Sequence, residues 1–226
     1  MKNLITLLCI TLVVVFSHVT ASADPITLTF DEVPPGLVSV TNPTPPAGTS
    51  PFLTTSGITF EFRVGGLLSA DARYGANGPG AFTFVQGRVL EGDAAGILTL
   101  NFVVPTSQFQ FGLGLTSPNN VTPGLTVELF DTALQSLGVN SVNTNRISTL
   151  PLSEGTFSYA GAPISRAVLN FNEDALAFPR RFALDNLTVN QIPEPTTIGL
   201  LSMGLAGLAA RHARKKAARI AKEAHV

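Results

Sequence analysis

Residues 96–104 read GILTLNFVV and residues 125–130 read LTVELF. Both stretches are short, apolar and rich in residues that favour strands, and the second ends at Asp131, a common turn residue. Short runs of this kind are typical of strands, because a helix would need a longer segment with a 3.6-residue repeat. We therefore expect both stretches to be β-strands.

Strand-like patterns recur on both sides of these stretches. Ile58, Phe60 and Phe62 alternate with polar residues, which places the three apolar side chains on one face of a strand. No segment within 24–190 shows the repeat of an amphipathic helix. The sequence predicts an all-β fold, an antiparallel β-sandwich of jelly-roll-like type, with about nine strands. The other predicted strands cover residues 26–30, 58–62, 81–84, 109–115, 156–159, 166–171 and 182–189.

Two stretches rich in glycine or proline are predicted to be loops. Residues 34–51 contain six prolines, which a central strand does not tolerate, so we expect a loop or a proline-rich edge strand there. Residues 65–80 form the second loop, and Arg73, Tyr74 and Asn77 lie close together in it. These three residues are the best candidates for contact with a sugar or another surface ligand. The alternative is an ordinary surface loop.

The C-terminal segment has three parts in a fixed order. Pro193-Glu194-Pro195 comes first and cannot continue a strand or helix, because proline fixes φ and lacks a donor. Residues 196–210 then form an uncharged apolar run of 15 residues. Six cations follow, beginning with Arg211. A permanent membrane span needs about 20 apolar residues, so this run favours temporary retention in a membrane.

This order of triplet, apolar run and basic cluster resembles the PEP-CTERM sorting signal of Gram-negative bacteria. The resemblance implies that an exosortase recognises Pro193, Glu194 and Pro195 and cuts near them, while a transmembrane sorting helix and Arg211 retain the chain in the inner membrane. The tail departs from the family pattern, because it is looser than a compact arginine cluster and continues to Val226.

The N-terminal segment has the parts of a secretory signal peptide. Lys2 is the positive residue, residues 4–16 are the apolar region, and Ala21-Ser22-Ala23 is a small-residue cleavage site. The alternative is a permanent N-terminal anchor. We expect signal peptidase to release a mature chain that begins at Asp24 after transport by the Sec machinery. The predicted organisation is a signal peptide over 1–23, a β-sandwich ectodomain over 24–190 and a sorting signal over 191–226.

The composition of the segment between these signals restricts its chemistry. Residues 24–195 contain seven arginines and fourteen acidic residues, a net charge of 7 − 14 = −7, with no lysine, histidine or cysteine. The acidic charge argues against nucleic-acid binding. The missing residue types exclude Ser-His-Asp and Cys-His catalysis, Schiff-base chemistry, and metal sites built on histidine or cysteine. Carboxylates remain the main candidates for acid–base chemistry.

Both ends of the ectodomain carry acidic motifs. Residues 29–33 read TFDEV and residues 183–189 read ALDNLTV, which resembles many PEP-CTERM ectodomains and, more loosely, carbohydrate-binding jelly rolls. The resemblance implies that the first and last strands lie side by side. It also implies a structural Ca²⁺, for which oxygen ligands would come from Asp31, Glu32, Asp185 and Asn186. The alternative is that Asp185 and Asn186 only make hydrogen bonds at a turn or strand edge.

These observations predict an exported, non-enzymatic protein of the cell surface or extracellular matrix. The resemblance links it to exopolysaccharide or biofilm, with an exosortase-type enzyme as partner and the inner membrane as a transient location. A carbohydrate-binding module that recognises a polysaccharide is the alternative. A glycoside hydrolase with two carboxylates is a third reading.

Overall fold

The computed structural model describes residues 24–31, 38–39, 57–77, 82–147, 150–191, 204–207, 209 and 212, with only the backbone described at 38–39 and 75–77. Eleven strands account for most of these residues, and every pairing between them is antiparallel. The sheet lies within a unit that spans Ala23–Ile192. Its strands are β1 (Ile26–Leu28), β2 (Val38–Ser39), β3 (Ile58–Val64), β4 (Leu67–Leu68), β5 (Arg73–Asn77), β6 (Arg88–Asp93), β7 (Gly96–Leu115), β8 (Val121–Phe130), β9 (Ser136–Arg146), β10 (Ser153–Phe171) and β11 (Arg181–Gln191).

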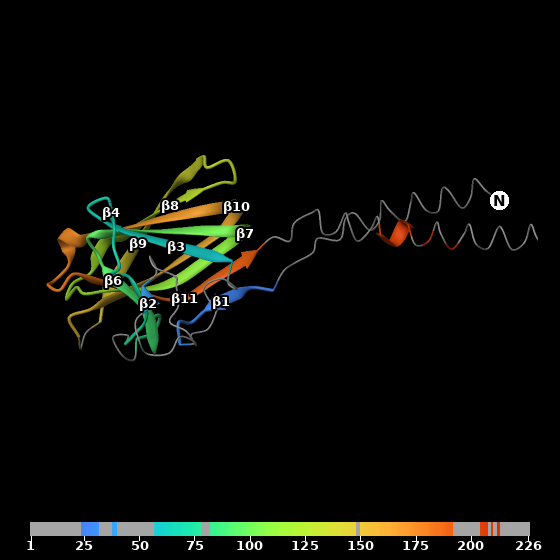
Figure 1. The fold of residues 1–226 in the computed structure, drawn as a ribbon. Coiled ribbons are helices and arrows are strands. Elements are labelled where there is room, and N and C mark those ends of the chain that lie inside the picture. The colour runs from blue at the N-terminus through green and yellow to red at the C-terminus, as the bar shows by residue number, and fades with distance from the viewer. Residues whose placement is uncertain are drawn as a thin grey trace, which may run out of the picture. The chain divides into compact units, whose positions relative to one another are not determined.

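Two long strands, β7 and β10, hold the fold together (Figure 1). The first half of β7 pairs with β3 on one side and with the second half of β10 on the other. The second half of β7 pairs with β11 and with the first half of β10. Registers shift within β10 between Ala160 and Arg166, where the ladder is interrupted. One continuous sheet therefore supplies both layers, and β7 and β10 belong to each layer in turn.

Aromatic contacts show that the two parts of the sheet pack face to face. Phe62 of β3 lies 5.9 Å from Phe182 of β11, measured between ring centroids, although their strands do not pair. Phe171 of β10 stacks on Phe182 at 4.0 Å. These rings are almost fully buried, so they fill the main core between the layers. This two-layer packing is that of a β-sandwich.

The main sequence prediction, an all-β antiparallel fold, is confirmed. The first and last strands are neighbours, since Ile26 pairs with Val189 and Leu28 pairs with Leu187. The predicted strands at 96–104 and 109–115 are one strand, β7, and those at 156–159 and 166–171 are both parts of β10. Within the described part of 24–190 the only helical element is a 3₁₀ turn, η1 (Glu173–Ala175).

Two predictions about local structure are wrong. Residues 82–84 do not form a strand, because their N–H groups bind a carboxylate instead of a neighbouring strand. The predicted loop at 65–80 contains β4 and β5. Most of the stretch at 34–51 lies outside the described residues, but Val38–Ser39 form β2, which pairs with β5 at the end of the strand order, as the edge alternative predicts.

The predicted transmembrane helix at 196–210 falls largely outside the described residues. Residues 204–207, 209 and 212 are helical. Among the residues that the structure describes, no helix has the length and apolar character needed to span a bilayer. The predicted signal peptide at 1–23 also lies outside them.

Candidate functional site

The outer face of the layer formed by β6, β11, β7 and β10 carries most of the charged side chains that the fold brings together. Side chains alternate along β11, so Phe182 and Leu184 enter the main core while Ala183 and Asp185 lie on the outer face. Ala183 pairs with Glu91 of β6 and with Gly114 of β7, so these residues lie on the same face of the sheet as Ala183. We call this surface the outer face.

Residues 82–87 cross the outer face without joining the sheet, and we call them the 82–87 segment. Backbone N–H groups outside a strand need other acceptors, and three carboxylates provide them here. Glu154 binds the segment near its start, Asp185 near its end, and Asp31 binds the first residue of β6. The donor–acceptor distances are 3.0 Å from Thr83 N and from Phe84 N to Glu154 Oε2, 2.8 Å from Gln86 N to Asp185 Oδ2, and 2.8 Å from Arg88 N to Asp31 Oδ1.

Asp185 is the buried member of this set, with 1% of its surface exposed. Its Oδ1 accepts the N–H of Asn186 at 2.6 Å, so both carboxylate oxygens bind backbone donors. Asn186 has φ 52° and lies where the register of β11 against β7 shifts, which marks a bulge. Asparagine tolerates this conformation better than most residues. The bulge directs Asp185 at the 82–87 segment.

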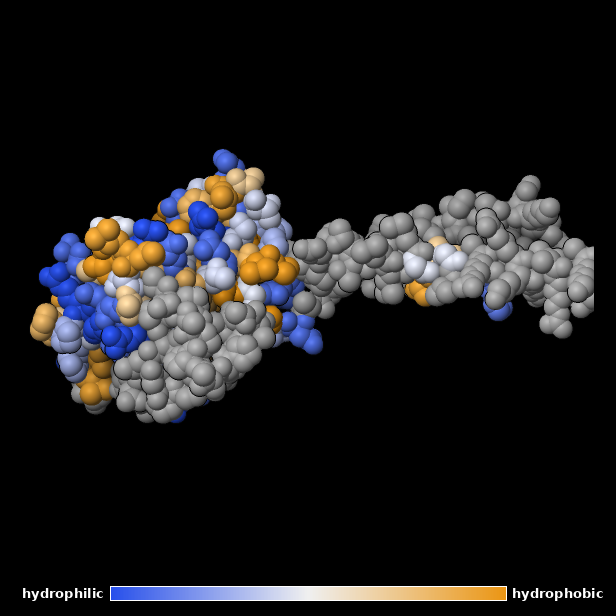
Figure 2. Space-filling view, in the orientation of Figure 1, coloured by the Kyte–Doolittle hydropathy of each residue, from blue (hydrophilic) through white to orange (hydrophobic). Residues whose placement is uncertain are grey.

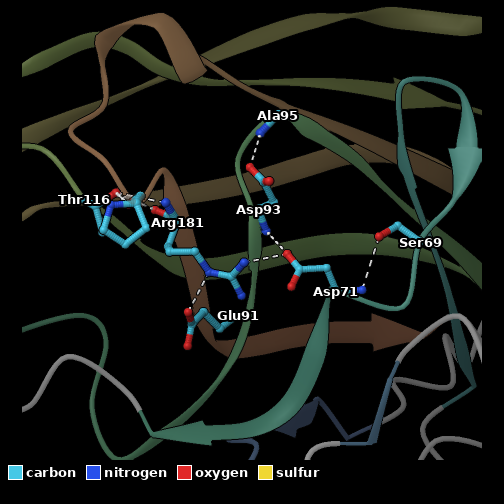
Figure 3. A network of polar contacts seen from close by, with 8 residues as sticks. Ser69, Asp71, Glu91, Asp93, Ala95, Thr116 and Arg181 are labelled. Atoms are coloured by element: carbon cyan, nitrogen blue, oxygen red, sulfur yellow. Dashed lines mark hydrogen bonds and ion pairs between the residues drawn. The ribbon is translucent and has the colours of Figure 1, made fainter.

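A second group of charges surrounds Arg181, the first residue of β11 (Figure 3). Its Nε donates to Glu91 Oε1 at 2.8 Å, and its Nη1 donates to Asp71 Oδ2. Asp71 Oδ2 also accepts the N–H of Asp93 at 2.8 Å. The Arg181 backbone N–H donates to Thr116 Oγ1 at 2.9 Å. The side chain of Arg181 is therefore fixed by two carboxylates and its backbone by a hydroxyl.

The protonation of Arg181 follows from these neighbours. Partial burial lowers its pKa, but the hydrogen bonds and charges of Glu91 and Asp71 outweigh the burial and raise the pKa above its ordinary value. The guanidinium thus keeps its charge at any physiological pH. Its remaining nitrogen, Nη2, has no hydrogen-bond partner among the described residues, as Figure 3 shows.

A pocket of about 170 Å³ opens on the outer face beside this group. Gly114 and Ala183 form the part contributed by the middle of the sheet. Phe82 and Leu152 contribute apolar side chains from outside the sheet, and Arg181 with Glu91 contributes polar ones. The same region contains a small second core of Phe82, Val85, Val89 and Ala183. Figure 2 shows apolar patches interspersed with polar side chains on the visible face of this unit.

The structure separates the three residues predicted to contact a ligand. Arg73 is exposed and pairs in register with Glu91, beside the Arg181 group. Tyr74 is fully buried against the rings of Phe30 and Phe60, which corrects its assignment as a ligand contact. The side chain of Asn77 lies outside the described residues. Alternation along β5 explains the split, since neighbouring side chains point to opposite faces.

The residues predicted to hold calcium are also only partly together. Asp31 and Asp185 bind N–H groups two residues apart, at Arg88 and Gln86. Asn186 donates from Nδ2 to Asp185 Oδ2 at 3.1 Å, so its amide group faces that carboxylate with a donor. No group of three acidic, histidine or cysteine side chains suited to a metal occurs among the described residues. Glu32 lies outside them, so the calcium site stays a prediction without support from the described donors.

Sequence reasoning missed the Arg181 group. Arg181 and Asp71 are 110 residues apart in sequence, and Arg181 and Glu91 are 90 apart. No local spacing joins them. The one available signal is a charged pair, Arg180-Arg181, directly before a strand-like run.

The sorting residues Pro193, Glu194, Pro195 and Arg211 lie outside the described residues, and their assignment rests on sequence. The PEP-CTERM protein-sorting motif matches residues 191–215. The chain is thus an antiparallel β-sheet protein with a C-terminal sorting signal. That signal is the PEP-CTERM motif, which implies export and membrane-anchored sorting in Gram-negative bacteria with processing by an exosortase-type enzyme.

Comparisons with other proteins add little to this identification. No curated protein matches the chain. A mutant of the family 29 carbohydrate-binding module CBM29-2 is similar at 12% identity and a TM-score of 0.30, covering 59% of this chain and 89% of the module. A xylanase 10B fragment from Clostridium thermocellum, with xylohexaose, shows 9% identity and a TM-score of 0.33 over 75% of this chain and 28% of the fragment. A tandem CBM22 domain of Xyn10C from Paenibacillus barcinonensis shows 14% identity and a TM-score of 0.37 over 77% and 50%. Because each TM-score lies below 0.5, these similarities define no function for this chain.

Proposed function

We propose that this chain is an exported, non-enzymatic protein of the cell surface or extracellular matrix, delivered by an exosortase-type pathway and associated with exopolysaccharide. The observation that carries the proposal is the PEP-CTERM motif at residues 191–215. Within it, Pro193-Glu194-Pro195 is the recognition element and the basic cluster beginning at Arg211 is the cytoplasmic stop. The N-terminal signal peptide starts export.

The non-enzymatic part of the proposal is supported by how the ectodomain uses its acidic residues. A glycoside hydrolase needs two carboxylates facing a substrate across several ångströms. Glu154, Asp185 and Asp31 bind backbone N–H groups, and Glu91 and Asp71 bind Arg181. These five acids therefore have roles in holding the fold. The same segment has no histidine, cysteine or lysine to serve instead.

The sorting proposal is tested by replacing Pro193, Glu194 and Pro195 with alanine in the producing cell. We expect the variant to stay uncut in the inner membrane, while the unchanged protein loses its C-terminal segment and leaves that membrane. A matched control replaces Thr196 and Thr197 with alanine, which keeps the triplet and the apolar run. Equal release of the triple variant and the unchanged protein would contradict the proposal.

A further inference from the structure

The pocket beside Arg181 has the size of a site for one small ring. Its volume is about 170 Å³. Pockets for drug-sized ligands are larger, about 300–1,000 Å³. The pocket therefore suits a single six-membered ring rather than an extended chain.

The lining of the pocket has two chemically different sides. Leu152 is partly exposed and presents apolar surface, whereas Phe82 and Val89 are buried beneath the pocket. Gly114 and Ala183 leave space because their side chains are absent or small. Arg181 and Glu91 present polar groups. A ligand that fills this pocket needs an apolar surface on one side and hydrogen-bonding groups on the other. A sugar ring has both, because its C–H groups form apolar faces and its hydroxyls lie around the edge.

The polar side is held in place before any ligand arrives. Glu91 and Asp71 fix the guanidinium of Arg181 through Nε and Nη1, which leaves Nη2 without a hydrogen-bond partner among the described residues. The side chains of Arg181 and Glu91 are 26% and 30% exposed, so solvent and ligands reach them. Nη2 is a donor for a hydroxyl oxygen, and a carboxylate oxygen of Glu91 is an acceptor for a hydroxyl hydrogen. Groups fixed in this way lose little freedom when they bind.

The charge of the lining offers no advantage to acids. Glu91 and Arg181 are the two charged residues of the lining, and their charges cancel. An anionic ligand such as a uronic acid or a phosphate would lie beside the Glu91 carboxylate, and two donors of Arg181, Nε and Nη1, are already bound to carboxylates. A neutral ligand meets no such cost.

We propose that this pocket binds a single neutral sugar residue, at the end or on a side branch of a glycan. Leu152 contacts the apolar face of the ring, and Arg181 with Glu91 binds its hydroxyls. The inference rests on the proposed matrix function and names the ligand class and the site. Phe178, which is 95% exposed three residues before Arg181, is available to contact a neighbouring sugar unit. The next residue along the chain, Pro179, is hydrogen-bonded to the pocket, because its carbonyl accepts from Oγ1 of the lining residue Thr116 at 2.7 Å.

The test measures sugar binding by the purified full-length chain in detergent. The probes are methyl glycosides of glucose, galactose, mannose and N-acetylglucosamine, with glucuronate as the acidic counterpart, followed by oligosaccharides of the neutral sugar that binds. Saturation-transfer NMR and calorimetry are the readouts. We expect one neutral glycoside to bind with a Kd of about 1 mM, which is typical of so small a ligand, and glucuronate to bind at least about tenfold more weakly.

Two variants connect binding to the pocket. Gly114→Ala adds a methyl group that would lie 3.6 Å from Val85 Cγ2, an ordinary contact, so the protein folds and the pocket shrinks. Arg181→Ala removes the fixed donor. We expect each change to weaken binding about tenfold, and Arg180→Ala, the matched control, to leave binding unchanged.

The proposal is overturned if no neutral glycoside binds at about ten times the expected Kd, if glucuronate binds more tightly than the neutral sugars, or if Gly114→Ala binds as well as the unchanged protein. An oligosaccharide that binds better than its monosaccharide supports the contact between Phe178 and a neighbouring sugar unit, and one that binds more weakly contradicts a site for a chain end or branch. Failure of sugar binding leaves the cellular sorting result unaffected, so the two proposals are judged separately.

Discussion

The outer face has two halves that use the same residue types in opposite ways. In the covered half, Asp185 and Glu154 bind the backbone of the 82–87 segment, which lies directly on Gly112. In the open half, Glu91 holds Arg181 beside a pocket in which Gly114 leaves space. Carboxylates that bind backbone N–H groups fix the segment on the sheet, whereas the carboxylates that hold the Arg181 guanidinium leave one of its nitrogens available. Acidic composition alone does not distinguish these two uses.

The strongest test of this contrast compares two glycines in β7. A Cβ at Gly112 would overlap the carbonyl oxygen of Phe84, whereas a Cβ at Gly114 would make only ordinary contacts. We expect Gly112→Ala to lower the free energy of unfolding by about 3 kcal/mol, because the clash is with backbone that must move. Gly114→Ala should change it by less than about 1 kcal/mol. Chemical denaturation of both variants checks this, and equal losses would show that the 82–87 segment does not lie on Gly112.

The next largest effect concerns the carboxylates of the covered half. Asp185→Asn keeps the shape but presents an amide N–H₂ where one backbone N–H needs an acceptor. We expect a loss of about 2 kcal/mol, because a buried donor is left unpaired. Glu154→Gln, at a partly exposed position, should lose about 1 kcal/mol or less. If Asp185→Asn proved as stable as the unchanged protein, the buried hydrogen bonds would not be what fixes the segment.

The two adjacent arginines provide the test of the open half. Arg181→Ala removes contacts to Glu91 and Asp71 and should lower stability by about 1 kcal/mol, since both ion pairs are partly screened by solvent. Among the described residues, the side chain of Arg180 makes one ion pair, to Glu173 at 3.1 Å, and both side chains are exposed. Arg180→Ala should therefore cost less than about 0.5 kcal/mol. Thermal unfolding at low and high salt compares the pair, and equal effects would show that the Arg181 group has no special role.

The smallest effect is expected at Tyr74, which sequence reasoning placed on the surface. Its hydroxyl is buried and has no hydrogen-bond partner among the described residues. Tyr74→Phe should leave stability unchanged or raise it by up to about 1 kcal/mol, because an unpaired polar group leaves the core. A clear loss of stability would reveal a hydrogen-bond partner for the hydroxyl.

Tyr74 also predicts an alkaline response. Burial raises the pKa of its phenol well above the ordinary value. The unfolded chain therefore loses this proton at lower pH than the folded chain does. The titration of Tyr74 therefore leaves the stability of the fold unchanged below about pH 10 and lowers it as the pH rises above that value. Denaturation of Tyr74→Phe and the unchanged protein between about pH 8 and 11 should show the smaller decline in the variant. Tyr159→Phe is the control, because that hydroxyl donates to the Ala162 carbonyl at 2.8 Å.

The sequence predicts the strands that show an alternating pattern or an apolar run, and it does not predict β6 and β9, which show neither. Ile58, Phe60 and Phe62 alternate with polar residues, and β3 was predicted from them. In β6, Val89 and Leu90 are both buried although they point to opposite faces, because the 82–87 segment covers the outer one. Strand β9 was missed because its first residues, Ser136–Ser141, are all exposed and show no apolar face.

The same limit applies to the candidate sites. The sorting signal is continuous in sequence, so Pro193-Glu194-Pro195 and the segments after it were recognised, and the motif match agrees. The Arg181 group is assembled from β11, β6 and the residues before β5, so only the fold brings it together. Residues 81–84 were predicted to be a strand from their alternating pattern. The acceptor of the Thr83 and Phe84 N–H groups, Glu154, is about 70 residues away, so no local pattern reveals it.

Removal of the C-terminal segment during export is what makes it a sorting signal. The intact mass of the protein isolated from the surface or medium of the producing cells tests this removal. We expect a chain that begins at Asp24 and ends near Pro193-Glu194-Pro195, without the apolar run and the basic cluster that follow. A secreted chain that still carries residues 196–226 would contradict it.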